Sequence, residues 1–438
     1  MDNDILYNAM RRAKMLGADQ IDILAVEDNA ISVSTRLANL ENVTRSETIS
    51  IKMRTSLGKR SAVVITNNVD ELKKESFVQK AVFAAKNAPE ETTEFRPNPN
   101  ELCKNFAKID VCDTQTVSSQ DLIDAALECE STALQINGIT NSEGAKASHS
   151  RSKIILMKND DFFAEYDRTF NQLSVVTLAE KDGFLEQDYD FSETVYWSDL
   201  KNPQLIAKES AERTLRRLGA RKIQSCKVPV IFDRRVSSQL LGDFVAAISG
   251  GSVANGISFL KDKLSQKIFS DEVSIVDKYS TARGLRSRPF DSDGLECSDT
   301  IVVQSGVLQS FILNMKYANK LRMKSTGNAL GFDGVAPNNI CIENGTRSFQ
   351  DLLKSVKNGL YVVEALGNGL NIVTGNYSQG AVGFWIENGE IAYPVNEVTI
   401  AGNFIEMLSN CKVANDLKIN SGIDAPSLLL NEIVVGGV

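Results

Sequence analysis

Residues 381–400, AVGFWIENGEIAYPVNEVTI, decide the fold of the C-terminal half of the chain. Two runs of β-branched and aromatic side chains, FWIE and EIAYPV, stand on either side of Asn388-Gly389. An Asn-Gly pair is favoured at the two central positions of a type I′ turn, whose twist matches that of paired antiparallel strands. The stretch therefore predicts a β-hairpin.

Strand-like segments continue on both sides of this hairpin. Residues 227–233, KVPVIFD, are typical of a buried strand, and residues 234–249 have the apolar spacing of a helix that ends at Gly250-Gly251. Residues 226–438 are therefore expected to form a β-rich C-terminal domain. Its other strand-like segments are TIVVQSGVLQSFIL (300–313), NNICIEN (338–344), GLYVVEAL (359–366) and LLLNEIVVG (428–436).

The first 95 residues predict a smaller α+β domain. Residues 4–16 have the spacing of a helix. Residues 21–28 and 31–37 alternate between apolar and polar side chains, as strands do, and Asn29-Ala30 between them is expected to form a tight turn. Two further strands are expected at 47–55 and 61–68, and a second helix from Asp70 to residue 87.

A central α+β domain is expected over residues 110–222, after an exposed connection rich in Pro and Glu at 88–101. Ser119 is a suitable N-cap for a helix that continues to about residue 136. Several strands and a helix ending at Gly219 follow. The fold class is thus predicted as α+β, with N-terminal α/β units that contain a mixed sheet and a strand-rich C-terminal domain.

The composition excludes several classes of function. The chain of 438 residues has a single histidine, His149, so any mechanism that needs two imidazoles from this chain is excluded, including that of the H-E-x-x-H zinc peptidases. The net charge of −8 argues against nucleic-acid binding, which depends on clustered Lys and Arg. No run of 18 apolar residues is present and the N-terminus lacks the apolar core of a signal peptide, so no membrane segment is expected.

The seven cysteines are scattered and form no C-x-x-C pair. An odd, unclustered set in a chain of this length is typical of reduced thiols in the cytoplasm, where we expect this protein. Their positions are Cys103, Cys112, Cys129, Cys226, Cys297, Cys341 and Cys411.

Two further patterns have a functional and a structural interpretation. The basic run Arg213, Arg216, Arg217, Arg221 and Lys222 could contact an anionic partner, but a solvated helix face near the C-terminal end of the dipole is the simpler interpretation. Asn376-Tyr377-Ser378-Gln379-Gly380 is one residue away from the G-x-S-x-G motif of serine hydrolases. The required base would be His149, which belongs to a different predicted domain.

Three polar, Gly-containing loops of the C-terminal domain are candidates for ligand binding, because binding groups concentrate on loops that a rigid scaffold projects. They are residues 283–291, at the start of RGLRSRPFDSDG (283–294), residues 324–328, within LRMKSTGNALG (321–331), and residues 374–378. Capping of the loops themselves is the simpler interpretation of each residue. The candidate substrate-binding residues are Arg283, Arg286, Lys324, Ser325, Thr326, Asn328, Asn376 and Ser378.

These loops also resemble a known family. Together with ERTLRRLGARKI (212–223) and TGNYSQGAVGFWIENGEIAYPVNEVTIAGNFIEML (374–408), they are similar to the TldD/PmbA family, historically named modulators of DNA gyrase. The resemblance covers nearly the whole chain and is to the PmbA branch, also called TldE. It implies a heteromeric zinc peptidase, in which TldD-type subunits supply the zinc ligands through an H-E-x-x-x-H helix and a cysteine near the C-terminus.

The resemblance places this zinc motif at Gly242, Asp243 and Ala247 within SQLLGDFVAAISGG (238–251). Glycine and alanine stand where the two histidines are expected. VANDLKINSG (413–422) is followed directly by IDAPSLLLNEIVV, without the segment that bears the family's cysteine, and Cys411 precedes it. The resemblance therefore implies no catalytic residue and no metal in this chain.

The implied function is that of the non-zinc subunit of a TldD/TldE-type metallopeptidase that degrades or processes small unfolded peptides. Zinc is expected in the TldD-type partner, while this chain contributes chamber walls and substrate binding, with peptide added as a strand at a sheet edge. The alternative is a catalytically silent binding or regulatory protein that forms a homodimer. Neither nucleic acid nor a membrane is an expected partner.

Overall fold

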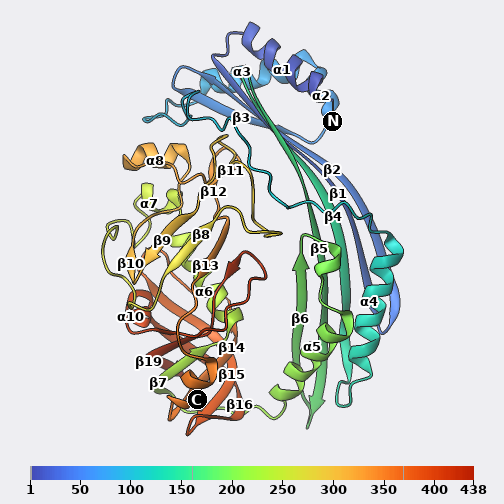
Figure 1. Cartoon of the computed structure of the whole chain (residues 1–438), viewed down its shortest axis with the longest axis vertical. Helices are drawn as coiled ribbons and strands as arrows, with labels where there is room; N and C mark the ends of the chain where they lie inside the picture. The colour runs from blue at the N-terminus through green and yellow to red at the C-terminus, as the bar shows by residue number, and fades with distance from the viewer. Residues whose placement is uncertain (1, 160, 368) are drawn as a thin grey trace.

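The computed structural model describes residues 2–159, 161–367 and 369–438. It has an α+β fold, as the sequence predicts. A sheet of long strands forms one side of the molecule, and the strand-rich C-terminal part lies opposite it (Figure 1). Within the described ranges, every helix is too short or too polar to traverse a lipid bilayer.

The long sheet has the strand order β3-β2-β1-β4-β5-β6. All its pairings are antiparallel, whereas the sequence predicted a mixed sheet in this part. Parallel neighbours need a long crossover, and here short turns join β1 to β2, β2 to β3 and β5 to β6. The strands are β1 (Gln20–Arg36), β2 (Asn39–Leu57), β3 (Arg60–Thr66), β4 (Asn141–Lys158), β5 (Phe162–Lys181) and β6 (Phe184–Thr194).

Both predicted N-terminal domains, 1–95 and 110–222, contribute three strands each to this one sheet. The sequence divided the chain into domains at 1–95, 110–222 and 226–438. The first two of these segments are joined by backbone hydrogen bonds within one sheet, and the division into three domains stays a prediction.

The predicted turn at Asn29-Ala30 is wrong, because β1 runs straight through these residues and pairs with β2 and β4 on both sides. The chain turns instead at Leu37 and Ala38, which have φ values of 51° and 55°. Positive φ is uncommon for such residues. The buried carboxylate of Glu130 accepts hydrogen bonds from both backbone N–H groups, at 2.8 and 3.1 Å, and so supports the turn.

Helices cover one face of the long sheet in two groups. Ile21, Ile23 and Ala25 of β1 point into a core with the first group, whereas Leu24 packs on the opposite face against Phe290 of the C-terminal part. This alternation is the period of two expected of a strand, here with both faces covered. The groups are α1 (Asn3–Met15), α2 (Val69–Lys73) and α3 (Glu75–Asn87), and α4 (Ser119–Leu134) and α5 (Pro203–Arg217).

The C-terminal part contains a six-stranded sheet in the order β16-β15-β14-β7-β19-β17, and β16 also pairs with β19. The hairpin predicted at Asn388-Gly389 is confirmed: these residues have φ values of 52° and 80° between β15 and β16. The strands are β7 (Cys226–Phe232), β14 (Asn358–Leu366), β15 (Asn376–Glu387), β16 (Glu390–Asn403), β17 (Lys412–Val413) and β19 (Leu428–Gly436).

A second C-terminal sheet, in the order β10-β9-β8-β13-β18, encloses the largest apolar core together with the first. Its strands are β8 (Ile275–Lys278), β9 (Thr300–Gln304), β10 (Val307–Leu308), β13 (Asn339–Ile342) and β18 (Ile423–Asp424), and β11 (Ala329–Leu330) pairs with β12 (Gly334–Val335). The helices of this part are α6 (Arg234–Ala247), α7 (Gly250–Ala254), α8 (Met315–Leu321), α9 (Phe349–Lys354) and α10 (Phe404–Ser409).

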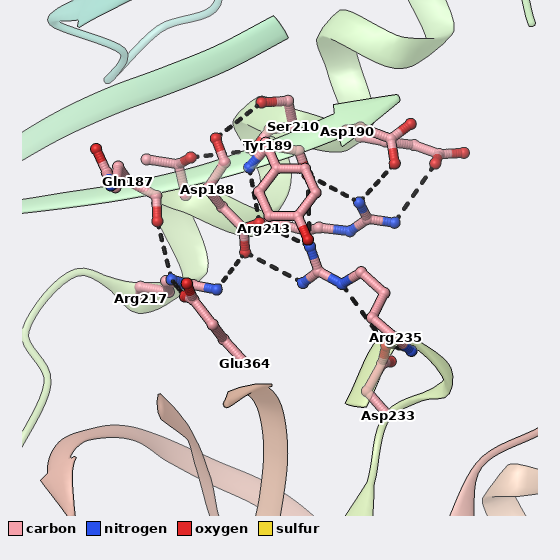
Figure 2. A network of polar contacts seen from close by, with 12 residues as sticks. Gln187, Asp188, Tyr189, Asp190, Ser210, Arg213, Arg217, Asp233, Arg235 and Glu364 are labelled. Atoms are coloured by element: carbon pink, nitrogen blue, oxygen red, sulfur yellow. Dashed lines mark hydrogen bonds and ion pairs between the residues drawn. The ribbon is translucent and has the colours of Figure 1, made fainter. Parts of the chain in front are cut away.

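A buried charge cluster joins the long sheet to the C-terminal part (Figure 2). The carboxylate of Asp188 on β6 lies 2.6 Å from Nη2 of Arg217 on α5 and accepts a 2.9 Å hydrogen bond from Nη1 of Arg235 on α6. Arg217 also pairs with Glu364 on β14 at 2.5 Å. The side chains of Asp188 and Arg217 are only 1% and 4% exposed. Burial opposes the ionisation of Asp188, but its contacts with the two arginines outweigh this and hold its pKa below the ordinary value.

We interpreted the basic run 213–222 as a solvated helix face. This interpretation is wrong for its central member, Arg217, because its side chain is buried. The other cations also have partners within the protein. Arg213 pairs with Asp190, Lys222 with Glu397, and the guanidinium groups of Arg216 and Arg221 lie over aromatic rings. Helix position alone could not reveal these partners, because they lie on other elements.

We expect Asp188→Asn to lower the free energy of unfolding by about 3–5 kcal/mol, because two buried guanidinium groups lose their shared carboxylate while the shape of the side chain is kept. Urea unfolding can be followed by the fluorescence of Trp197, which follows β6, and of Trp385 on β15.

Glu212→Gln is the matched control, since Glu212 forms an exposed ion pair with Lys208 on α5. Exposed pairs contribute little, so this variant should change stability by less than about 0.5 kcal/mol. Equal effects of the two substitutions would contradict a structural role for the cluster.

Candidate functional site

A cavity of about 350 Å³ lies between the long sheet and the C-terminal part. We call it the main cavity because α6 and the charge cluster border it, although other cavities of the protein are larger. Side chains of β6, α5, α6 and residues 418–425 line it, and the charge cluster around Asp188 borders it. The lining residues are Tyr189, Asp190, Phe191, Lys201, Glu209, Arg213, Asp233, Arg234, Arg235, Ser238, Gln239, Gly242, Arg286, Lys418, Asn420, Ser421, Ile423, Asp424 and Ala425.

Helix α6 supplies one wall of the cavity. Its N-terminus is capped by Asp233, whose side chain accepts a 3.0 Å hydrogen bond from the backbone N–H of Arg235. Its apolar face is buried in the C-terminal core, which leaves the stripe Arg235, Ser238, Gln239 and Gly242 toward the cavity. A Cβ atom at Gly242 would meet nothing within 4 Å, so the backbone of α6 is directly open to the cavity here.

The segment 418–425 continues this wall. The carboxylate of Asp424 accepts backbone N–H groups from Ser421 and Gly422, at 3.1 and 2.9 Å, which fixes the turn. The N–H of Ala425 donates to Oγ of Ser238 at 3.0 Å and ties the segment to α6. The fold therefore brings together α6 and the segment that follows VANDLKINSG, the two regions in which the sequence resemblance locates zinc ligands.

The three positions of the degenerate zinc motif have different environments. Gly242 faces the cavity, Ala247 is completely buried in the core, and Asp243 is half-buried. Burial raises the pKa of Asp243 to about 6, and its Oδ2 has no hydrogen-bond partner among the described residues. Cys411 is buried in the apolar core, which raises the pKa of its thiol. Across the described ranges, no three side chains of His, Cys, Asp or Glu come together as a metal-binding group.

Of the candidate substrate-binding residues, Arg286 lines the main cavity. Arg283 instead links the C-terminal part to residues near the end of β6: it pairs with Asp199 at 2.8 Å and lies 3.8 Å from the ring centroid of Tyr196. The structure therefore separates two arginines that the sequence placed in one loop.

The other candidates lie away from this cavity. Lys324 is exposed, and the hydroxyl groups of Ser325 and Thr326 donate to the carbonyl of Leu313. Asn328 is fully buried and donates to Asp277 at 2.9 Å. Asn376 and Ser378 are exposed at the start of β15. His149 contacts Asn171 within the long sheet, so it does not lie with Ser378.

Sequence reasoning missed most of the cavity wall. The polar stripe Arg235, Ser238, Gln239 and Gly242 follows the spacing i, i+3, i+4, i+7 opposite the apolar face of α6, and this spacing could have identified it. Lys201, Arg213 and Lys418 carry no such signal, because they reach the cavity from separate elements.

Two family models match the chain. One describes the PmbA/TldA metallopeptidase central domain and matches residues 112–218, and the other describes the C-terminal domain of the same metallopeptidases and matches residues 225–437. The protein of Escherichia coli O157:H7 named Metalloprotease PmbA is 33% identical over 438 residues, which cover 99% of this chain and 96% of that protein. Its homologue in Haemophilus influenzae is 32% identical over 98% of this chain and 94% of that protein.

Solved structures have the same fold. A protein of Thermotoga maritima described as a modulator of a DNA gyrase superimposes with a TM-score of 0.89 at 25% identity, covering 99% of this chain and all of the other. TldE from Thermococcus kodakarensis superimposes with a TM-score of 0.86, again over 99% of this chain and all of the other, and at 18% identity this likeness concerns the fold alone. By its domain matches and its full-length relatives, this chain belongs to the PmbA/TldD family of metallopeptidases.

Proposed function

We propose that this chain is the substrate-binding, non-zinc subunit of a cytoplasmic metallopeptidase that cleaves small unfolded peptides, with a TldD-type subunit supplying zinc and the catalytic groups. The observation that carries the proposal is the chemistry of the motif positions. Gly242 has no side chain and Ala247 is buried and apolar, so only Asp243 offers an atom that could coordinate zinc. Catalytic zinc sites have about three protein ligands, and the residues present here do not fit one.

The main cavity supports a role in binding substrate. It is bordered by two rigid elements, β6 and α6, and its wall at Gly242 is backbone rather than side chain. A peptide in extended conformation presents both N–H and C=O groups, which suit a cavity that is polar on several sides.

The strand β6 lies at an edge of the long sheet, and two arginines of α5 restrict the addition of a peptide as a further strand there. The carbonyl of Gln187 accepts a 2.9 Å hydrogen bond from Arg217, and that of Tyr189 accepts a 3.1 Å hydrogen bond from Arg213. Within the described structure, the backbone of Phe191, which lines the cavity, has no hydrogen-bond partner other than β5. We therefore infer that strand addition, if substrate uses this edge, begins at Phe191 and proceeds away from the charge cluster.

The proposal is tested by peptide hydrolysis with purified chains. This chain alone, supplied with zinc, should release no product from an unstructured peptide, whereas a mixture with a TldD-type subunit should cleave it and lose activity with a chelator. The subunits should co-purify, with zinc counted on the partner.

Chelator-sensitive hydrolysis by this chain alone would contradict the proposed division of roles. A stable homodimer that binds peptides but neither joins nor activates a TldD-type subunit would favour the alternative, a catalytically silent binding protein.

Gly242→Trp should weaken binding of an unstructured peptide by about tenfold or more, because the indole would occupy the open space next to α6. Gly242→Ala is the matched control, which should leave binding unchanged and raise the free energy of unfolding by about 0.5–1 kcal/mol, since alanine favours the helix. Fluorescence anisotropy of a labelled peptide measures the first effect and urea unfolding the second. Unchanged binding by the Trp variant would exclude this cavity as the peptide site.

Asp243→Asn should stabilise the protein by about 1–2 kcal/mol at pH 7.5, because the native carboxylate, with a pKa of about 6, is costly to ionise. The carboxyl group of Asp243 holds its proton more strongly in the folded state than in the unfolded state. This group therefore lowers the free energy of unfolding of the unsubstituted protein as the pH rises from 4 to 6. The difference between the two proteins should therefore disappear near pH 4. Urea unfolding at several pH values checks this, with Glu212→Gln as the control; a destabilising effect at pH 7.5 would show that the carboxylate has a stabilising partner.

A further inference from the structure

The cationic side chains of the main cavity fall into two groups. Four of the six have a carboxylate within 4.0 Å: Lys201 and Arg213 share Asp190 and Glu209, Arg234 lies near Asp416, and Arg235 pairs with Asp188. The other two, Arg286 and Lys418, form no ion pair with any described residue. Lys418 is exposed to solvent, whereas Arg286 is partly buried and so has the greater need for a counter-charge.

Arg286 is held in a fixed position with its end left unpaired. Its Nε donates to the carbonyl of Ser421 at 3.2 Å, and its backbone N–H donates to Oδ1 of Asn339 at 3.1 Å. Its stem packs so closely on Gly422 that a Cβ there would come within 2.7 Å of Cδ of Arg286. Within the described structure the two Nη groups have no hydrogen-bond acceptor, so they can both donate to a ligand in the cavity.

Two further arginines place more positive charge behind Arg286. Arg168 on β5 donates to the carbonyl of Leu285, and Arg288 donates to the carbonyl of Ala336 at 2.8 Å and to two other neutral oxygens. Neither is in an ion pair with a described residue, and both line a second cavity of about 700 Å³. Burial, together with repulsion by these two groups, lowers the pKa of Arg286.

The nearby carboxylates compensate this charge incompletely. Glu193 and Asp424 act on Arg286 from beyond ion-pair distance. Burial raises the pKa of Glu193, and Asp424 is occupied by the N–H groups of its own turn. On the side of Arg288, burial raises the pKa values of Asp277 and Asp291, so these two groups are weaker counter-charges than ordinary carboxylates.

We propose that Arg286, reinforced by Arg168 and Arg288, binds a carboxylate group of the peptide that occupies the main cavity. A guanidinium group with two free Nη donors matches the two oxygens of a carboxylate, and pairing would relieve the cost of a partly buried cation. The inference rests on the proposed peptide-binding function and adds a chemical preference to it. The carboxylate can be the C-terminal group of the peptide or an Asp or Glu side chain.

Three N-acetylated peptides of one uncharged sequence, labelled with the same neutral fluorophore, separate these sources. The first has a free C-terminus, the second is amidated, and the third is amidated but contains one central Glu. Fluorescence anisotropy with the full chain should show the first or third peptide binding about tenfold more tightly than the second, the ratio expected of one charge-assisted pair. Preference for the first identifies the terminal carboxylate, and preference for the third identifies a side chain.

Arg286→Gln should remove this preference, so that the variant binds the three peptides with equal affinity, and Arg286→Lys should restore part of it. Arg11→Gln, on the exposed face of α1, is the matched control and should behave like the native chain. The peptide comparison in the native chain tests the inference even if a variant folds poorly.

The outcomes separate the inference from the proposed function. Equal affinity of the native chain for all three peptides, or a preference that survives Arg286→Gln, would overturn the carboxylate site while leaving peptide binding intact. Absence of binding to every peptide would overturn both the site and the substrate-binding role.

Discussion

The carboxylate of Asp188 is the contact on which the arrangement of the two halves depends. It lies on β6 of the long sheet and reaches Arg217 on α5 and Arg235 on α6, so three elements share one buried negative charge. One carboxylate can pair with two guanidinium groups at once only if all three groups keep a fixed geometry. Displacement of any of them would leave a buried charge unpaired. This requirement fixes the distance between β6 and α6, and that distance sets the width of the main cavity.

The same cluster determines which part of β6 can receive a ligand. Arg213 and Arg217 each also donate a hydrogen bond to a carbonyl group of the strand edge, so the edge next to the cluster is already hydrogen-bonded. An unprotected edge strand is a template for pairing with any extended chain. Arginines that occupy part of the edge restrict such pairing to the segment that lines the cavity, and the structural contact therefore also restricts where a peptide can bind.

Cations in this protein differ in whether folding neutralises them. The arginines of the Asp188 cluster are paired by carboxylates within the chain, and their function is to hold elements together. Arg168, Arg286 and Arg288 are directed mainly to carbonyl and amide oxygens, which solvate a guanidinium group without cancelling its charge. Positive charge that the fold immobilises but does not neutralise is available to an anionic ligand, and this distinguishes a binding arginine from a structural one.

Local sequence patterns determined part of the secondary structure and the resemblance to the family. The Asn388-Gly389 hairpin, the helix α6 and the α+β class follow from turn chemistry and apolar period, which act between residues close in the chain. The residue types at positions 242, 243 and 247 are likewise fixed by the sequence. Tertiary structure alone decided that β1 continues through Asn29-Ala30, because two neighbouring strands pair across it, and that Arg286 lines the cavity while Arg283 does not. It also decided that Arg217 pairs with Glu364, 147 residues away, because the energy of a charge depends on its neighbours in space and on its burial, which a linear pattern does not contain.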